Sequence, residues 1–393
     1  MKQSKQIFRD ALLLTGASLL MRSVGIAFQV AISNRAGAEV MGLYSLMAGV
    51  YGFALTLATS GIHLGVTRMV AEFLSFEDHR RIKGFLKSAV AYALVCGSLA
   101  ALLLQVMAEP IGVHWLSDAR TVPALRILAI SLPFLGLSSV FGGYFTATRK
   151  SYKTAVLQIT EQFIKISLTL YFFSFLSDPD PKLLLCILVL AGVISEILSF
   201  LIGWILFILE KRKIGFSKKE KIPFGDFKPL IQITFPLAIT SYIRSGLLTL
   251  QHVLIPRGLR KSGASHATAL VSYGHIHSMA LPVILYPAAL ISSFSGLLIP
   301  TMAECHAQNR STQIRYIVSR VWFFSMVFSV GTAGILVCFS HELGQLLYPR
   351  TDAERYIRIL APLIPIMYLD TATDAMLKEI GRASCRERVY DSV

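Results

Sequence analysis

Charged residues are scarce in this chain. Asp, Glu, Lys and Arg make up 16% of its 393 residues, whereas a soluble domain carries about 25%. Since 54% of the residues are hydrophobic, a soluble fold would expose large apolar patches. The apolar residues form continuous blocks of about 20, the length with which a helix crosses the hydrocarbon core. Continuous rather than alternating blocks predict an all-α integral membrane protein.

Cysteine pairs and catalytic motifs are also lacking. The five cysteines show no CxxC spacing, which argues against a disulfide framework or a zinc site. The sequence has no GxxxxGK[ST] loop for ATP and no HExxH or GxSxG motif. We therefore expect no enzymatic activity, no metal site and no cofactor, and leave open only an unidentified coupling ion.

Acidic residues are fewer than basic ones, and the net charge is +15. In a membrane protein, this excess favours basic cytoplasmic loops beside anionic lipid over a nucleic-acid partner. Lys and Arg concentrate in alternate loops, which predicts a multi-pass protein of the plasma membrane with a cytoplasmic N-terminus. The loop from Arg257 to Lys261 fits this orientation less well.

Ten spans are predicted, and a basic linker at residues 210–228 divides them into two groups. An N-terminal lobe would cover 1–209, with six spans, and a partial C-terminal lobe would cover 229–378, with four. The predicted spans are 9–32, 41–66, 84–107, 122–146, 154–176, 183–209, 229–254, 269–299, 316–339 and 356–377.

Matching segments in the two groups indicate an internal repeat. Arg126-Ile127-Leu128-Ala129 followed by Pro133 has a counterpart in Arg358-Ile359-Leu360-Ala361 followed by Pro365. At the same offset, Ala71-Glu72 matches Ala303-Glu304, and at a similar offset Arg22-Ser23 matches Arg244-Ser245. Six spans per copy, an even number, predict parallel repeats and a cavity between two six-helix lobes.

The repeat also predicts that the second lobe is incomplete. A copy of the fifth span should begin near Arg382, but residues 379–393 are polar and cannot cross a membrane. We interpret this tail as foreign sequence, because residues 380–389 resemble a translated sequencing adapter.

Two arginines lie inside predicted spans, where a charge costs about 2.5–3.5 kcal/mol. Arg22 and Arg244 occupy matched positions in the two copies, so both could face the shared cavity. Two guanidiniums there would suit a phosphate or diphosphate, which they grip bidentately. The alternative is that each neutralises an acid or lines a small polar pocket within its own lobe.

Other charged residues within spans are further cavity candidates. Glu161 and Lys165 share a helix face, as a structural pair or as a contact for a coupling proton or the cargo. Glu196 is alone near the centre of its span and could pair with Arg22 or bind a coupling cation. Asp370 and Asp374 are similar candidates in the incomplete lobe.

Charges at the inner ends of two spans are candidates for a gate. Arg68 and Glu72 follow the second span, and Glu304 repeats the latter. The alternative is that these side chains are solvated at the interface.

The order of these elements resembles the multidrug/oligosaccharidyl-lipid/polysaccharide exporter superfamily, and most of all its branch of stage V sporulation protein B and polysaccharide exporters. The resemblance covers about residues 5–378, and the polar tail departs from it. The family usually has twelve or fourteen spans. The segments that carry the resemblance are Leu14-Thr15-Gly16-Ala17 with Arg22, Arg35 to Tyr44, Ser60-Gly61-Ile62 with Arg68, and Tyr368-Leu369-Asp370 with Leu377-Lys378.

This resemblance implies a flippase that exports a lipid-linked peptidoglycan or polysaccharide precursor by alternating access, with a role in spore cortex synthesis. Arg22 and Arg244 would then contact the cargo phosphates. Two other functions stay open: a cation-coupled multidrug exporter, which expects an acidic, aromatic cavity, and a non-transporting scaffold that binds cell-wall synthesis enzymes.

Overall fold

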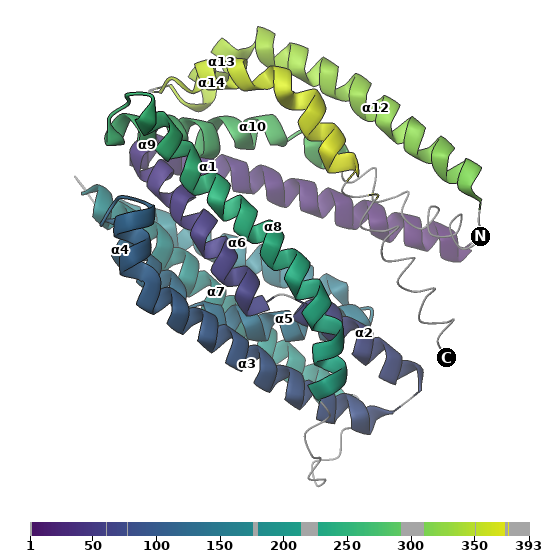
Figure 1. Cartoon of the computed structure of the whole chain (residues 1–393). Helices are drawn as coiled ribbons and strands as arrows, with labels where there is room; N and C mark the ends of the chain where they lie inside the picture. The colour runs from purple at the N-terminus through teal and green to yellow at the C-terminus, as the bar shows by residue number, and fades with distance from the viewer. Residues whose placement is uncertain are drawn as a thin grey trace. The chain divides into compact units, whose positions relative to one another are not determined.

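A computed structural model (Figure 1) describes residues 2–59, 61–76, 78–175, 180–213, 227–291, 310–349, 351–373 and 376. All regular structure in these residues is helical, which confirms the all-α class. The α-helices are α1 (Lys2–Thr59), α2 (Ile62–Ser75), α3 (His79–Pro110), α4 (Thr121–Ala129), α5 (Leu132–Ala147), α6 (Ser151–Ser174), α7 (Pro181–Lys213), α8 (Phe227–Lys261), α9 (His266–Gly274), α10 (Leu281–Leu285), α12 (Ser311–Cys338), α13 (Ser340–Leu347) and α14 (Ala353–Leu360). Three shorter elements are the π-helices η1 (Ile111–Trp115) and η2 (His275–Ala280) and the 3-10 helix η3 (Ala361–Leu363).

The chain forms two compact units, and neither is a continuous half of the sequence. One consists of residues 39–270 and is called here the 39–270 unit; the other combines residues 1–38 with 271–393 and is called the split unit. The predicted lobes, 1–209 and 229–378, are drawn along the sequence and do not coincide with these units. The lobe boundaries therefore stay a prediction about the repeat.

Helix α1 passes from one unit to the other at a break in its geometry. Gly37 has φ 80° and ψ 165°, a conformation that residues with a Cβ rarely adopt. The first and second predicted spans therefore meet at Gly37, next to the boundary between the units at residues 38 and 39. Gly61, within the second predicted span, has a φ of 74° and caps the separate helix α2.

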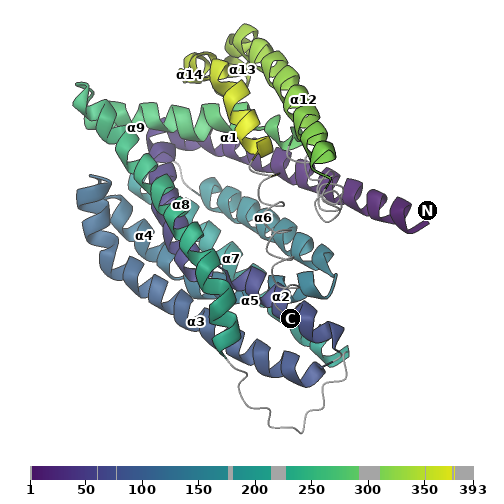
Figure 2. The ribbon, with the colours of Figure 1, turned by 45° about the vertical axis from the view of Figure 1, so that its right-hand side comes forward.

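The core of the 39–270 unit lies where α2, α3, α5 and α7 pack together. Phe141 stacks on Phe207 with ring centroids 4.9 Å apart and on Phe200 at 5.8 Å. Helices α6 and α7 run side by side in the same unit (Figure 2). These contacts bury apolar faces of the second to sixth predicted spans against one another.

A bend divides the fourth predicted span. Helices α4 and α5 meet at 41° across a short break, and Pro133 lies in the first turn of α5. Proline supplies no backbone N–H and cannot continue a helix without losing a hydrogen bond, so the kink follows from the sequence.

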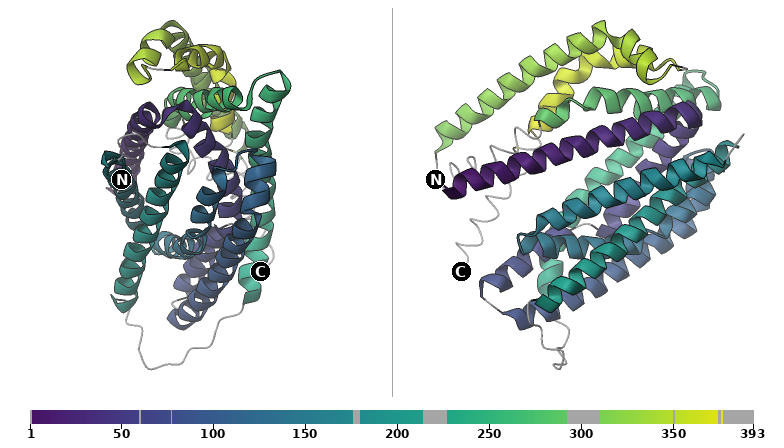
Figure 3. Two further views of the ribbon diagram at one scale, coloured as in Figure 1. Left: turned by 90° about the vertical axis from the view of Figure 1, so that its left-hand side faces the viewer. Right: turned by 180° about the vertical axis from the view of Figure 1, so that it is seen from behind.

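The split unit has its own core around α10, α12, α14 and the helical residues 364–373. Helix α12 packs against α14 and η3 (Figure 3). The phenol of Tyr368 is buried and donates a hydrogen bond of 2.6 Å to the carbonyl oxygen of Ile284. This bond joins the tenth predicted span to the middle of the eighth.

The first and seventh predicted spans pack in matching ways. In the split unit, the hydroxyl groups of Ser23 and Tyr286 are 2.7 Å apart, which ties the first half of α1 to the middle of the eighth predicted span. In the 39–270 unit, Thr56 donates to Ser245 at 3.0 Å, which ties α8 to the second span. Each copy of the Arg-Ser pair therefore lies beside the second span of the other copy of the repeat.

Several helices have the length and composition of membrane spans. The described residues contain five such segments, or six when the bent pair α4 and α5 is taken as one span. The five are Leu19–Ser75, Arg80–Trp115, Pro181–Glu210, His266–Leu285 and Thr312–Cys338. The protein is therefore a multi-pass helical membrane protein, while the number of ten spans stays a prediction.

The close packing of α5 on α2 can be tested by substituting a glycine at their contact. A Cβ atom at Gly143 would lie 2.7 Å from the carbonyl oxygen of His63 and 2.9 Å from Val66 Cβ. We expect Gly143→Ala to destabilise the protein by about 1–3 kcal/mol through overpacking. The measurement is the thermal unfolding midpoint in detergent. Gly52→Ala is the matched control, since nothing lies within 4 Å of its added Cβ, and an equal midpoint for the two variants would contradict this packing.

Candidate functional site

A small polar cavity lies among α1, α4, α6 and α7 of the 39–270 unit. Its volume is about 60 Å³, enough for one or two water molecules. The residues that line it are Tyr44, Met47, Ala48, Tyr51, Leu128, Lys165, Leu188, Val189, Gly192 and Glu196. The cavity therefore combines an apolar wall with two phenols, an ammonium and a carboxylate.

Glu196 supplies the carboxylate from the middle of α7. The hydroxyl of Tyr51, on the second half of α1, donates a hydrogen bond of 3.1 Å to Glu196 Oε2. The same hydroxyl lies 2.6 Å from Ser131 Oγ, which in turn donates to the carbonyl oxygen of Leu128 at 3.0 Å. A chain of hydroxyl groups thus leads from the break between α4 and α5 to the carboxylate.

Lys165 supplies the ammonium from the middle of α6. Its Nζ donates to the hydroxyl of Tyr44 at 3.4 Å, and it interacts electrostatically with Glu196 and Glu161. Glu161 lies one helical turn before Lys165 and hydrogen-bonds to Ser199 of α7. The (i, i+4) spacing places both side chains on the face of α6 that packs against α7.

The structure thus brings together three of the predicted cavity residues, Glu161, Lys165 and Glu196. The sequence analysis missed the hydroxyl partners, Tyr51 and Ser131. Tyr44 and Tyr51 are seven residues apart, so they share a face of α1 after two helical turns. That spacing could have indicated a shared site for the two tyrosines. Because uncharged tyrosines are common in spans, it did not distinguish these two from the others.

Arg22 is an exposed side chain in the split unit. One guanidinium N–H group donates to the carbonyl oxygen of Leu285 at 2.9 Å, and a guanidinium carries five such groups. Arg244 is exposed on α8 of the 39–270 unit. Because the two arginines belong to different units, their joint contact with a phosphate stays a prediction.

The remaining candidates lie away from the polar cavity. Arg68 and Glu72 are exposed and one turn apart on α2, and Asp370 is exposed on the helical residues 364–373. Glu304 and Asp374 lie outside the described residues. Their role as a gate or as cavity residues stays a prediction.

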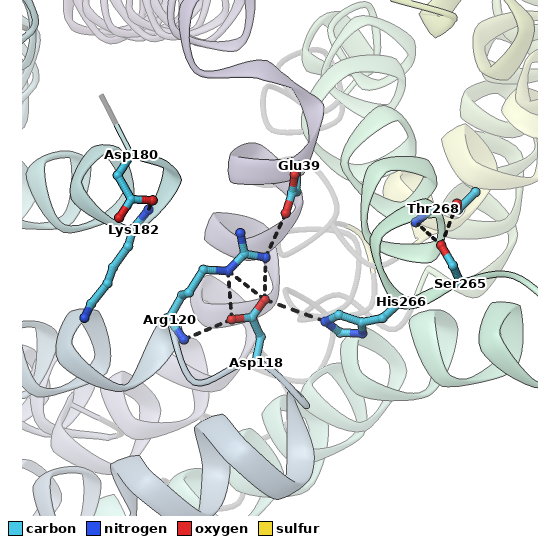
Figure 4. A network of polar contacts seen from close by, with 8 residues as sticks. All are labelled: Glu39, Asp118, Arg120, Asp180, Lys182, Ser265, His266 and Thr268. Carbon is cyan, nitrogen blue, oxygen red and sulfur yellow. Dashed lines mark hydrogen bonds and ion pairs between the residues drawn. The ribbon is translucent and has the colours of Figure 1, made fainter. Parts of the chain in front are cut away.

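A second polar network lies at one end of the 39–270 unit (Figure 4). Asp118, in the loop between η1 and α4, accepts two hydrogen bonds of 3.0 Å from Arg120 Nε and one of 2.6 Å from its terminal nitrogen. The same terminal nitrogen donates to Glu39 of α1 at 2.8 Å. His266, at the start of α9, places its Nε2 3.6 Å from Asp118 Oδ2. This network joins the loop to helices α1 and α9.

The charges in this network set the ionisation of Asp118. Burial raises the pKa of its carboxyl, but the hydrogen bonds from Arg120 and the charges of Arg120 and His266 outweigh burial and hold the pKa below its ordinary value. The hydrogen bond to Asp118 in turn raises the pKa of Arg120. The pair therefore stays ionised, and its role is structural, since the loop would otherwise leave a buried carboxylate unpaired.

Asp118→Asn tests this network through stability. We expect a loss of about 1.5–3 kcal/mol at neutral pH, because hydrogen bonds to a charged group are removed. A carboxyl with a lowered pKa contributes stability above its unfolded pKa of about 3.9, and this contribution is lost as the pH falls below that value. The difference in unfolding midpoint between wild type and variant should therefore shrink only in strong acid.

The matched control for Asp118→Asn is Glu109→Gln. Glu109 lies 3.7 Å from Arg126, and both side chains are exposed, at 72% and 49%. Exposed ion pairs contribute about 0–1 kcal/mol, so the midpoint should scarcely change. If the effect of Asp118→Asn persisted undiminished in strong acid, the carboxylate charge would not be its cause.

Residues 7–306 of the chain match the family described as "Polysaccharide biosynthesis protein". The chain is 24% identical over 384 residues to "Stage V sporulation protein B" of Bacillus subtilis (strain 168), covering 97% of this chain and 74% of the relative. It is also 24% identical over 171 residues to "Lipid II flippase MurJ" of the same organism, covering 42% of this chain and 31% of the relative.

The fold is similar to that of a solved structure described as the inward-facing conformation of a multidrug resistance MATE family transporter of the MOP superfamily. The TM-score is 0.68, with 12% sequence identity, over 93% of this chain and 82% of the other. At this identity the likeness shows the fold alone.

Proposed function

Since the chain belongs to the polysaccharide biosynthesis protein family, we propose that it moves an isoprenoid-diphosphate-linked saccharide across the plasma membrane by alternating access. The observation that carries this proposal is the similarity to "Stage V sporulation protein B" over 97% of the chain. The similarity to a relative named for lipid II flipping supports the same class of cargo. We place the activity in cell-wall synthesis during sporulation.

The alternatives have less support. A likeness in fold to a multidrug transporter does not extend to its cargo at 12% identity. A drug exporter was expected to have an acidic, aromatic cavity, whereas Lys165 lies in the cavity of the 39–270 unit beside Glu196. A scaffold for cell-wall enzymes would not need charged residues at mid-helix, since these are costly in a membrane unless they serve binding or transport.

The cargo would be held through its phosphates. Arg22 and Arg244 are both exposed, each in its own compact unit, and guanidinium groups bind phosphate bidentately. In this proposal the arginines grip the diphosphate, the saccharide crosses between the lobes, and the lipid tail stays in the bilayer. The cavity beside Glu196, at about 60 Å³, is far too small for a saccharide and would have another task.

Arginine substitutions test the cargo contact. We expect Arg22→Ala and Arg244→Ala each to reduce the flipping of a labelled lipid-linked precursor in proteoliposomes by about tenfold or more. The reason is that a hydrogen bond to a charged group contributes about 1.5–3 kcal/mol. Arg22→Lys and Arg244→Lys should recover only part of the rate, because an ammonium lacks the bidentate fork.

Arg81→Ala is the matched control for these variants. Arg81 is 73% exposed and pairs with Asp78 at the start of α3, so its loss should leave flipping unchanged. Wild-type rates in both alanine variants would remove the proposed cargo contact, while the absence of flipping in the unmodified chain would refute the function itself.

The proposed orientation is tested by labelling. With a cytoplasmic N-terminus, the loop between α2 and α3 lies inside and the loop between α8 and α9 lies outside. Ser75 and Ser262 are exposed residues at these two loops. In a background without native cysteines, we expect a membrane-impermeant maleimide to label Ser262→Cys but not Ser75→Cys in intact cells. The reverse pattern would invert the orientation.

A further inference from the structure

Three ionisable side chains at mid-helix form one cluster in the 39–270 unit. Glu161 and Lys165 lie near the middle of α6 (Ser151–Ser174), and Glu196 lies near the middle of α7 (Pro181–Lys213). Lys165 interacts electrostatically with both carboxylates, and the two carboxylates interact with each other. All three are partly buried, and Lys165 and Glu196 line the small cavity.

The charges of this cluster do not balance. Two carboxylates and one ammonium leave one negative charge when all three groups are ionised. The helices that pack on α7 supply no further charge to it. Helix α5 has no Asp, Glu, Lys or Arg, the one charged residue of α4 is Arg126, which pairs with Glu109, and the one charged residue in 39–59 of α1 is Glu39, which pairs with Arg120.

The remaining charges on α6 and α7 are also placed elsewhere. Lys153 of α6 and the preceding Lys150 both form ion pairs with Glu210 at the far end of α7. The other charged residues of α7 are Lys182 near its start and the basic residues 211–213 at its end. In the described parts of α1, α4, α5, α6 and α7 within this unit, every other charged residue is in one of these ion pairs or lies at an end of α7, so these helices supply no partner for the excess negative charge.

An uncompensated charge at mid-helix in a membrane is costly, so the cluster favours the uptake of one positive charge. A metal cation would have to sit in a cavity of about 60 Å³ beside the ammonium of Lys165, which repels it. A proton needs no coordination shell and adds directly to a carboxylate oxygen. The hydroxyl groups of Ser131 and Tyr51 form a hydrogen-bonded chain that reaches Glu196 Oε2.

We propose that the cluster of Glu161, Lys165 and Glu196 holds one exchangeable proton, and that Glu196 carries it. Protonation forms one O–H bond on the Glu196 carboxylate and changes the net charge of the cluster from −1 to zero; no other bond is made or broken. Glu161 remains the ionised partner of Lys165, which lies one turn away on the same helix. Glu196 takes the proton because it faces the cavity and ends the hydroxyl chain.

A role for this proton as the ion whose gradient drives transport rests on the proposed function. The binding of the proton by the folded protein does not rest on it. Protonation can therefore be measured without any cargo, in the purified chain in detergent or in liposomes.

Infrared difference spectra between two pH values provide the test, because a protonated carboxyl has its own carbonyl stretch. We expect this band in the unmodified protein near neutral pH. Glu196→Gln should abolish it, since Glu161 and Lys165 then balance. Glu161→Gln should shift the titration midpoint of this band by at least about one pH unit towards acid, since the charges of Glu196 and Lys165 then balance.

Lys165→Met should have the opposite effect on the band, because it removes the cation of the cluster. Two carboxylates would remain without a cation, so the band should grow about twofold in amplitude or persist to higher pH. Glu109→Gln, an exposed carboxylate outside the cluster, is the matched control and should leave the band unchanged. Far-ultraviolet circular dichroism of each variant shows that its helices are retained.

The proposal fails if the unmodified protein lacks the band, or if Glu196→Gln leaves it intact. It also fails if sodium chloride, compared with choline chloride, removes the band, since a sodium ion would then neutralise the cluster. These outcomes are separate from the fate of the proposed function, because the band is present or absent whether or not the protein flips a lipid-linked saccharide.

Discussion

The hydrocarbon core of a membrane offers polar side chains no partner, so each one inside it must be satisfied by the protein. This constraint governs the 39–270 unit. Glu196 accepts a hydrogen bond from Tyr51, Tyr51 contacts Ser131, and Lys165 donates to Tyr44. Because these residues come from three helices and from the break before α5, their contacts hold α1, α6 and α7 around one small cavity. The same contacts make that cavity chemically distinct from the apolar core of stacked phenylalanines.

The constraint also explains how the repeated segments pack. Ser23 and Ser245 occupy matched places in the two copies, and each bonds to a hydroxyl group on the second span of the other copy. Helix α1 takes part in both arrangements, since its first part belongs to the split unit and its second part to the 39–270 unit. The break at Gly37 lies next to that boundary, where an ordinary residue would be strained.

Much of the fold followed from the sequence. Blocks of apolar residues predicted helices, and the (i, i+4) spacing predicted that Glu161 and Lys165 share a face. The positive φ angles of Gly37 and Gly61 were not predicted, because they depend on local geometry that composition does not reveal. The Asp118 network was also missed, since it joins residues far apart in the sequence.

The sequence by itself determined that this protein lies in a membrane and that it is helical, because hydropathy and the length of apolar blocks are local properties. It also singled out charged residues that are costly at mid-helix, since each such cost belongs to one residue. Only the tertiary structure decided which of them meet. Glu196 reaches Tyr51 and Lys165 because three helices converge on one cavity, and convergence depends on how helix faces pack, which no local pattern specifies.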